Sequence, residues 1–224
     1  ISARFNNTGT VNVQSGTLSL SGGGTDIGAI YQGAGTVNFS GGTRTLDTTS
    51  RIDGNATFSG GQTTVNGGAG TGLLTVSGGT ATFNGTVITG ALTQSAGQLN
   101  GSGTLTATGA SSFSGGTQSG SGTTLATGGA SFSSTGFGLD GGRTLQLGGA
   151  STATGTFVQI NLNAVNPNTG VSDAGSGILT IASGATFTDQ TTSSGLTITA
   201  PSQGGTDTAA TSAVNNAGTF IKSG

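Results

Sequence analysis

One short phrase recurs along this chain: a strand-like run rich in Thr, Val and Leu, a glycine turn, and a second short run that ends on Phe. The clearest copies are GLLTVSGGTATFNG (72–85), GTLTATGASSFSGG (103–116), GTTLATGGASFS (122–133) and GILTIASGATFT (177–188). Internal repeats limit the fold more than local propensity does, because each unit must bury its apolar side against the next one. The repeat therefore predicts a stacked β-solenoid.

Within each copy a Leu and a Phe occupy matching places. The four pairs are Leu74 with Phe83, Leu105 with Phe113, Leu125 with Phe132, and Leu179 with Phe187. Glycine, Ser-Gly and Asn-Gly turns separate the runs, and such turns often need the positive φ that glycine adopts easily. We expect short strands throughout and no amphipathic helix.

Composition separates a folded repeat from a flexible linker. The 224 residues include 47 glycines, but only 2 prolines, a single lysine (Lys222) and no glutamate. Disordered segments usually have high net charge and abundant Pro, Glu or Lys, whereas the formal net charge here is −2. Apolar residues alternate with hydroxyl residues at regular positions, as they do in strands. We therefore expect an ordered all-β structure.

The expected architecture is a parallel β-helix of roughly seven to ten coils, each holding two or three short strands. Residues 1–224 are expected to form a single β-solenoid module. The segment near 156–176 departs from the repeat and contains Asn166-Pro167, so we expect a loop or excursion there. Ile1 stands in the middle of a phrase, which indicates a fragment or one unit of a longer repetitive protein.

The two ends of the sequence resemble each other. Residues 5–16 read FNNTGTVNVQSG and residues 214–224 read VNNAGTFIKSG, with the Asn pairs 209 positions apart. Two interpretations remain open: ordinary similarity between coils, or a tandem array with a period slightly above 209 residues.

Several functions are disfavoured by what the sequence lacks. Its five cationic residues are scattered, whereas nucleic-acid binding requires clustered Lys and Arg. The chain has no His and no Cys, which rules out Ser-His-Asp and Cys-His catalysis and ordinary zinc sites. Gly136, Gly138 and Asp140 resemble one unit of a calcium-binding nonapeptide, but no second unit adjoins it. No run approaches the length of a membrane span. We expect no catalytic, cofactor or metal site.

The one cluster of charged residues comprises Arg44, Asp47, Arg51 and Asp53. If Leu46 and Ile52 point inward, these four side chains could share an outer face of the solenoid. A solvated patch of ion pairs at a turn is the simpler interpretation. The alternative is a site for binding or cleaving a sugar, and cleavage would need two carboxylates roughly 5–10 Å apart.

The rhythm of several phrases resembles known surface proteins. FSGGQTTVNGG (58–68) and GLLTVSGGTATFNG (72–85) are similar to passenger repeats of bacterial autotransporters, and FNNTGTVNVQSGTLSLSGG (5–23) resembles filamentous-haemagglutinin-type proteins. This resemblance implies a right-handed parallel β-helix that is secreted or held at the bacterial cell surface, associated with the outer membrane.

We therefore expect a non-enzymatic structural or adhesive module that forms a rigid stalk or an extracellular filament. Its expected partners are copies or tandem neighbours joined end to end, and glycans or proteins of a host or matrix. The alternative function is a carbohydrate-active β-helix enzyme, either a polysaccharide lyase or a hydrolase, or a glycan-binding module. In an enzyme, Arg44, Asp47, Arg51 and Asp53 would form the cleft.

Overall fold

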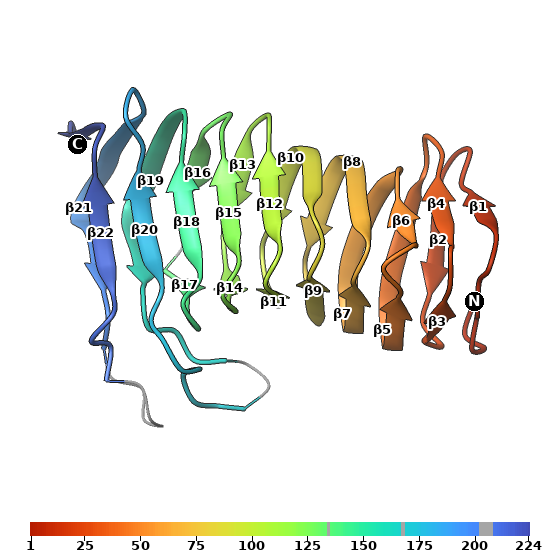
Figure 1. The fold of residues 1–224 in the computed structure, drawn as a ribbon. Coiled ribbons are helices and arrows are strands. Elements are labelled where there is room, and N and C mark those ends of the chain that lie inside the picture. Colours follow the sequence, from red (N-terminus) through yellow and green to blue (C-terminus); the bar gives the residue numbers. More distant parts are fainter. Residues whose placement is uncertain (134, 167–168, 202–207) are drawn as a thin grey trace.

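The chain folds into an elongated solenoid of parallel strands (Figure 1). The computed structural model describes residues 1–133, 135–166, 169–201 and 208–224. These residues form 23 strands and no helix, and the strands stack in about eight turns. The two termini lie at opposite ends of the stack. The predicted all-β fold and the predicted number of coils are confirmed, while the right hand of the coil stays a prediction.

The strand pairings sort into three faces, each a column of parallel strands. The first face contains β1 (Thr10–Asn12), β4 (Ile30–Gln32), β6 (Arg51–Ile52), β8 (Gly68–Val76), β10 (Val87–Gln94), β12 (Thr104–Ala107), β15 (Thr123–Ala126), β18 (Thr144–Leu147), β20 (Ile178–Ile181) and β22 (Ala213–Asn216).

The second face contains β2 (Thr17–Leu20), β13 (Ser111–Phe113), β16 (Ala130–Phe132) and β23 (Thr219–Lys222), together with the first parts of β5 (Thr36–Leu46), β7 (Asn55–Val65), β19 (Ala150–Asn161) and β21 (Thr186–Thr199). The later parts of β8 and β10 complete it.

The third face contains β3 (Gly24–Asp26), β9 (Thr80–Phe83), β11 (Gln98–Asn100), β14 (Gly116–Gln118) and β17 (Phe137–Leu139), with the later parts of β5, β7, β19 and β21. The long strands therefore bend around a corner and serve two faces each. Successive residues alternate between solvent and the interior, so one side of every strand builds the core.

Aromatic rings form a column inside the solenoid. Tyr31, Phe39, Phe58 and Phe83 follow one another with ring centroids 5.6, 5.1 and 5.4 Å apart. A second group contains Phe113, Phe132, Phe137, Phe187 and Phe220. Each ring covers part of the one below it, so the thin turns share one continuous apolar core.

The matching phrases are not in perfect register. Leu105 pairs with Thr124 and not with Leu125, so Leu125 is partly exposed and Thr124 is buried. A shift of one residue exchanges the two sides of a strand, and here it places a hydroxyl in the core. Phe83 also differs from its expected equivalents, because it lies on the third face in β9 while Phe113 lies on the second face in β13.

A column of glycines forms the corner between the second and third faces. Its members have φ between +58° and +81°, and they are Gly23, Gly42, Gly61, Gly79, Gly97 and Gly116. A Cβ on Gly61 would lie 2.3 Å from the carbonyl oxygen of Gly42, and a Cβ on Gly79 would lie 2.4 Å from that of Gly61. These six turns therefore need glycine here for their backbone conformation and for close contact with a neighbouring turn. We call this set the corner column.

The expected excursion is present, with different bounds. Thr156–Asn161 belong to β19, and the loop runs from Leu162 to Gly177 before β20. Of the segment predicted near 156–176, Pro167 and Asn168 lie outside the described residues. The loop packs against the preceding turn: Ala164 N donates to Leu139 O, and Gly142 N donates to Gly175 O. It leaves the rod near β17 and β20 (Figure 1).

The similar end phrases occupy different faces. Phe5–Asn7 run beside β3 of the third face, whereas residues 214–216 lie in β22 of the first face. Their shared feature is local: Asn7 Oδ1 accepts a hydrogen bond from Gly9 N, and Asn216 Oδ1 accepts one from Gly218 N. The Asn-x-Gly spacing makes the same turn at two different corners. The tandem array with a period slightly above 209 residues stays a prediction.

Candidate functional site

The structure separates the four charged residues that the sequence grouped together. Arg51 and Asp53 lie side by side on the outer surface of the first face, where Arg51 Nε is 2.6 Å from Asp53 Oδ2. Asp47 lies in the turn that precedes them. Arg44 is not part of this surface, because its side chain is buried and only 2% exposed.

Arg44 points inward because of strand alternation. In β5, Arg44 and Leu46 are two residues apart and therefore share a side, and Leu46 is buried. The guanidinium of Arg44 binds both carboxylate oxygens of Asp26 at 2.8 Å. The Tyr31 hydroxyl donates to Asp26 Oδ2 at 2.8 Å, and burial raises the pKa of Tyr31. The inner charge is thus neutralised within the N-terminal turns and plays no part in surface chemistry.

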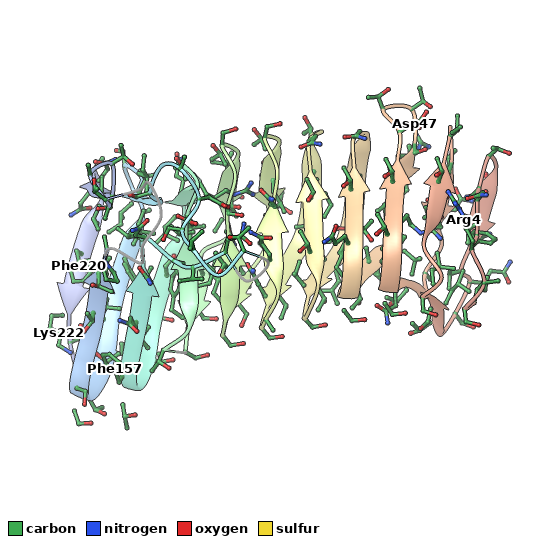
Figure 2. All side chains as sticks on the ribbon, turned by 90° about the horizontal axis from the view of Figure 1, so that it is seen from below. Arg4, Asp47, Phe157, Phe220 and Lys222 are labelled. Atoms are coloured by element: carbon green, nitrogen blue, oxygen red, sulfur yellow. The ribbon has the colours of Figure 1, made fainter. Side chains whose placement is uncertain are left out.

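The Asp47 turn is held by its own carboxylate. Asp47 accepts hydrogen bonds from the Ser50 and Thr49 hydroxyls at 2.6 and 2.8 Å and from Gly28 N at 3.1 Å. The Ser50 hydroxyl bond, with those from Thr49 and Gly28, lowers the pKa of Asp47 to about 2. Figure 2 shows Asp47 in a turn that stands out from the body of the rod. The turn is therefore ordered at neutral pH.

A groove of about 360 Å³ lies beside this turn on the first face. Its lining residues are Thr48, Thr49, Ser50, Arg51, Asp53, Gly68, Ala69, Gly70, Thr86 and Ile88. The middle of the groove is β8, where Gly68 and Gly70 face outward and Ala69 faces inward. Gly68 pairs with Arg51 of the preceding turn, and Gly70 pairs with Ile88 of the next. Gly68 and Gly70 have no side chains, whereas their neighbours Arg51 and Ile88 do. The surface is therefore depressed over the two glycines.

Few of the side chains that line the groove could take part in the cleavage of a ligand. Asp53 is the single carboxylate among its lining residues, and it is paired with Arg51. The Asp47 carboxylate is occupied by the turn. Glycoside hydrolysis generally requires a carboxylate pair across the scissile bond, so these lining residues do not form that arrangement.

A second cavity of about 250 Å³ lies under the loop that follows β19. Thr117, Thr135, Gln159, Asn161 and Val165 are among its lining residues, and none of the residues that line it is charged. Gly138 has no room for a side chain, because Ala164 packs over it. This cavity is a product of loop packing on the third face, and the groove beside the Asp47 turn is the stronger candidate site.

A buried polar network crosses the interior further along the rod. Arg143 is 0% exposed and donates to Thr124 Oγ1 at 2.8 Å and Gly101 O at 3.3 Å. Thr124 in turn donates to Gln118 Oε1 at 2.7 Å. Burial lowers the pKa of Arg143 to about 10. The network binds successive turns together and does not reach the groove.

The described residues contain no group of three or more acidic, His or Cys side chains that could hold a metal ion. Nor do they contain a helix of the length and hydrophobicity that crosses a membrane. Among the groove residues, sequence reasoning identified Arg51 and Asp53 and missed Gly68, Gly70, Thr86 and Ile88. The available signal was the spacing of Gly68 and Gly70, which leaves one side of a short strand without side chains.

Comparison with known proteins does not add a family to these observations. No protein-family model, no curated protein sequence and no solved structure matches this chain.

Proposed function

We propose that this chain is a non-enzymatic structural and adhesive module that forms a rigid rod on the outside of a bacterial cell. The observation that carries the proposal is the continuous parallel ladder on all three faces, which extends from the first turns to the last. A solenoid of this kind stabilises each turn through its neighbours and so gains length without needing a globular core. Such a fold is consistent with a structural or adhesive role.

The rhythm of the repeats supports an extracellular setting, because it resembles passenger repeats of autotransporters and filamentous-haemagglutinin-type proteins. A surface poor in charge also suits a stack, where side chains of successive turns lie in rows and like charges would repel. We propose secretion or attachment at the outer membrane on these grounds.

We further propose that the stack of turns continues end to end, through a second copy or through a tandem neighbour. The last turn exposes apolar side chains, with Val214 45%, Phe220 42% and Ile221 41% exposed. Figure 2 shows Phe220 and Lys222 at this end of the rod. Lys222 Nζ lies 3.3 Å from Asp189 Oδ2, which keeps the charge at this end paired.

Electron microscopy and light scattering of the purified protein would test the rod and its association. We expect straight rods with an axial spacing of about 4.8 Å between turns, and a mass that grows with concentration. Phe220→Asp should prevent growth, whereas Leu73→Asp, at an exposed position on β8 away from the ends, should not. Compact particles without the axial spacing would contradict the rod, and equal growth of both variants would contradict association through this end.

A glycan-binding role is the second candidate, and the groove beside the Asp47 turn favours it. Polysaccharide cleavage is not proposed, because the groove residues supply one carboxylate already in an ion pair. Incubation with polysaccharides of neutral and acidic type, followed by measurement of new reducing ends and unsaturated products, would test this. Any turnover that Asp53→Ala abolishes without loss of folding would restore the enzyme interpretation.

A further inference from the structure

We propose that the groove over Gly68 and Gly70 binds one neutral hexose unit of a glycan. This inference deepens the adhesive role proposed above, because it names the class of ligand and the surface that holds it. It rests on four features of the groove: glycines that the fold does not need, a neutral ion pair with free hydrogen-bonding atoms, an apolar wall, and a pre-ordered turn.

The glycines of the groove have no structural reason to be glycine. Neither Gly68 nor Gly70 has positive φ. A Cβ on Gly68 would come no closer than 3.5 Å, to Thr86 O, and a Cβ on Gly70 no closer than 3.9 Å, to Asp53 Oδ1. Both distances are ordinary van der Waals contacts. Glycine inside a strand also costs stability relative to residues with a side chain. The property that these two residues supply is therefore the empty space above them.

The polar wall of this space suits hydroxyl groups on adjacent carbons. The Arg51–Asp53 contact uses Nε of the guanidinium and Oδ2 of the carboxylate. The terminal amino groups of Arg51 and Oδ1 of Asp53 remain to donate to, and accept from, neighbouring hydroxyls. Arg51 is 57% and Asp53 33% exposed, so a ligand can reach both. Because the pair is neutral, it favours an uncharged ligand over a phosphate or an acidic sugar.

The opposite wall is apolar. Ile88 is 53% exposed and stands across Gly70 from the ion pair. The C–H face of a pyranose ring can pack on such a side chain while its hydroxyls face Arg51 and Asp53. Thr86 adds a hydroxyl to the lining. A volume of about 360 Å³ is within the range of small-ligand sites, and the groove is open to solvent, so a longer glycan could continue beyond the bound unit.

The Asp47 turn makes the site rigid before a ligand arrives. Its carboxylate bonds to Thr49 and Ser50, two residues that line the groove, and anchors them to Gly28 of the previous turn. A pre-ordered wall lowers the entropy cost of binding. A single sugar unit still offers little contact area, so we expect affinity for the monosaccharide of about millimolar Kd.

Amide chemical-shift titration of the ¹⁵N-labelled full chain would test this inference. The probes are methyl glucoside, methyl galactoside and methyl mannoside, with methyl glucuronide as the acidic analogue. We expect at least one neutral hexoside to shift the Gly68 and Gly70 amide signals saturably. Gly70→Val should weaken that binding more than tenfold by filling the groove. Thr106→Val, at the position that follows Ile88 in the same outer row, is the matched control and should bind as the parent does.

Three results would overturn the inference: no shift with any neutral hexoside, equal binding by Gly70→Val and the parent, or binding of the glucuronide alone. The test is independent of the rod. Gly70→Val should form the same rods in electron micrographs as the parent. Rods without sugar binding would refute the groove and leave the structural role, whereas sugar binding without rods would refute the structural role and leave the groove.

Discussion

Gly79 in the corner column and Gly70 in the groove differ in what an added side chain would meet. At Gly79 the backbone has φ +58°, and a Cβ would lie 2.4 Å from the Gly61 carbonyl oxygen. At Gly70 the nearest atom to a Cβ is 3.9 Å away. One glycine makes the turn possible, and the other leaves a space on a strand that could hold a side chain. Glycine content alone therefore does not distinguish the glycines that a turn requires from those that leave a space on the surface.

Two arginines show the same contrast between interior and outer face. Arg44 is buried against Asp26, Tyr31 and Gly23 O, while Arg51 is 57% exposed beside Asp53. Exposed ion pairs contribute little to stability, but a buried charge left without its partner is costly. In this solenoid, the contribution of an arginine to stability therefore depends on whether its side chain lies on the inner or the outer side of the strand.

The largest expected effect comes from breaking the buried pair. Arg44→Met should lower the free energy of unfolding by about 3–5 kcal/mol, because Asp26 would lose its cationic partner in the interior. Arg51→Met should change it by less than about 1 kcal/mol. Urea denaturation followed by circular dichroism would measure both. Similar losses of unfolding free energy in the two variants would contradict the expected difference between the buried and the exposed ion pair.

The corner column supplies the next effect. Gly79→Ala should lower the free energy of unfolding by about 2–4 kcal/mol, since it combines the strain of positive φ with a clash against Gly61 O. Gly16 provides the control, because its φ is +68° but nothing lies within 4 Å of an added Cβ. Gly16→Ala should therefore show the torsional cost of about 1–2 kcal/mol alone. Thermal and urea unfolding of both variants would separate the two contributions, and equal losses would argue against stacking as the reason for the corner glycines.

Acid should loosen the Asp47 turn when the Asp47 carboxylate takes up a proton. The folded-state pKa of Asp47 is about 2, below its ordinary 3.8. Its contribution is therefore present above pH about 4 and is lost as the pH falls towards 2. The amide signals of Thr49 and Ser50, which donate to Asp47 Oδ1, should titrate with a midpoint near pH 2. In Asp47→Asn the transition should disappear; a midpoint near 4 in the parent would show that the turn bonds are weak.

The smallest expected effect on stability is that of Gly70→Val. We expect the free energy of unfolding to change by no more than about 0.5 kcal/mol in either direction, because valine suits a strand and has room here. Chemical denaturation of this variant and of Gly79→Val would measure the difference between the groove glycine and the corner glycine directly. A loss of several kcal/mol in Gly70→Val would mean that the groove glycine is structural after all.

The sequence was sufficient to predict the solenoid, because apolar alternation and glycine turns are local patterns that every turn repeats. It also placed Arg51 and Asp53 on one outer surface. The inward position of Arg44 was within reach, since Leu46 lies two residues further along the same strand. The groove could not be predicted from the sequence, because it depends on which residues of different turns become neighbours. That register follows from corner lengths, and Leu125 shows how a shift of one residue exchanges inside and outside.

The parallel ladders also have a mechanical consequence. Hydrogen bonds between successive turns run along the long axis, so a pulling force applied to the two ends acts directly along them. Force would then load the weakest interface between turns and detach the rod one turn at a time, rather than shear many bonds together. Each detached turn would release its own contour length of chain, so the rod could extend in steps and limit the peak load on whatever holds its ends.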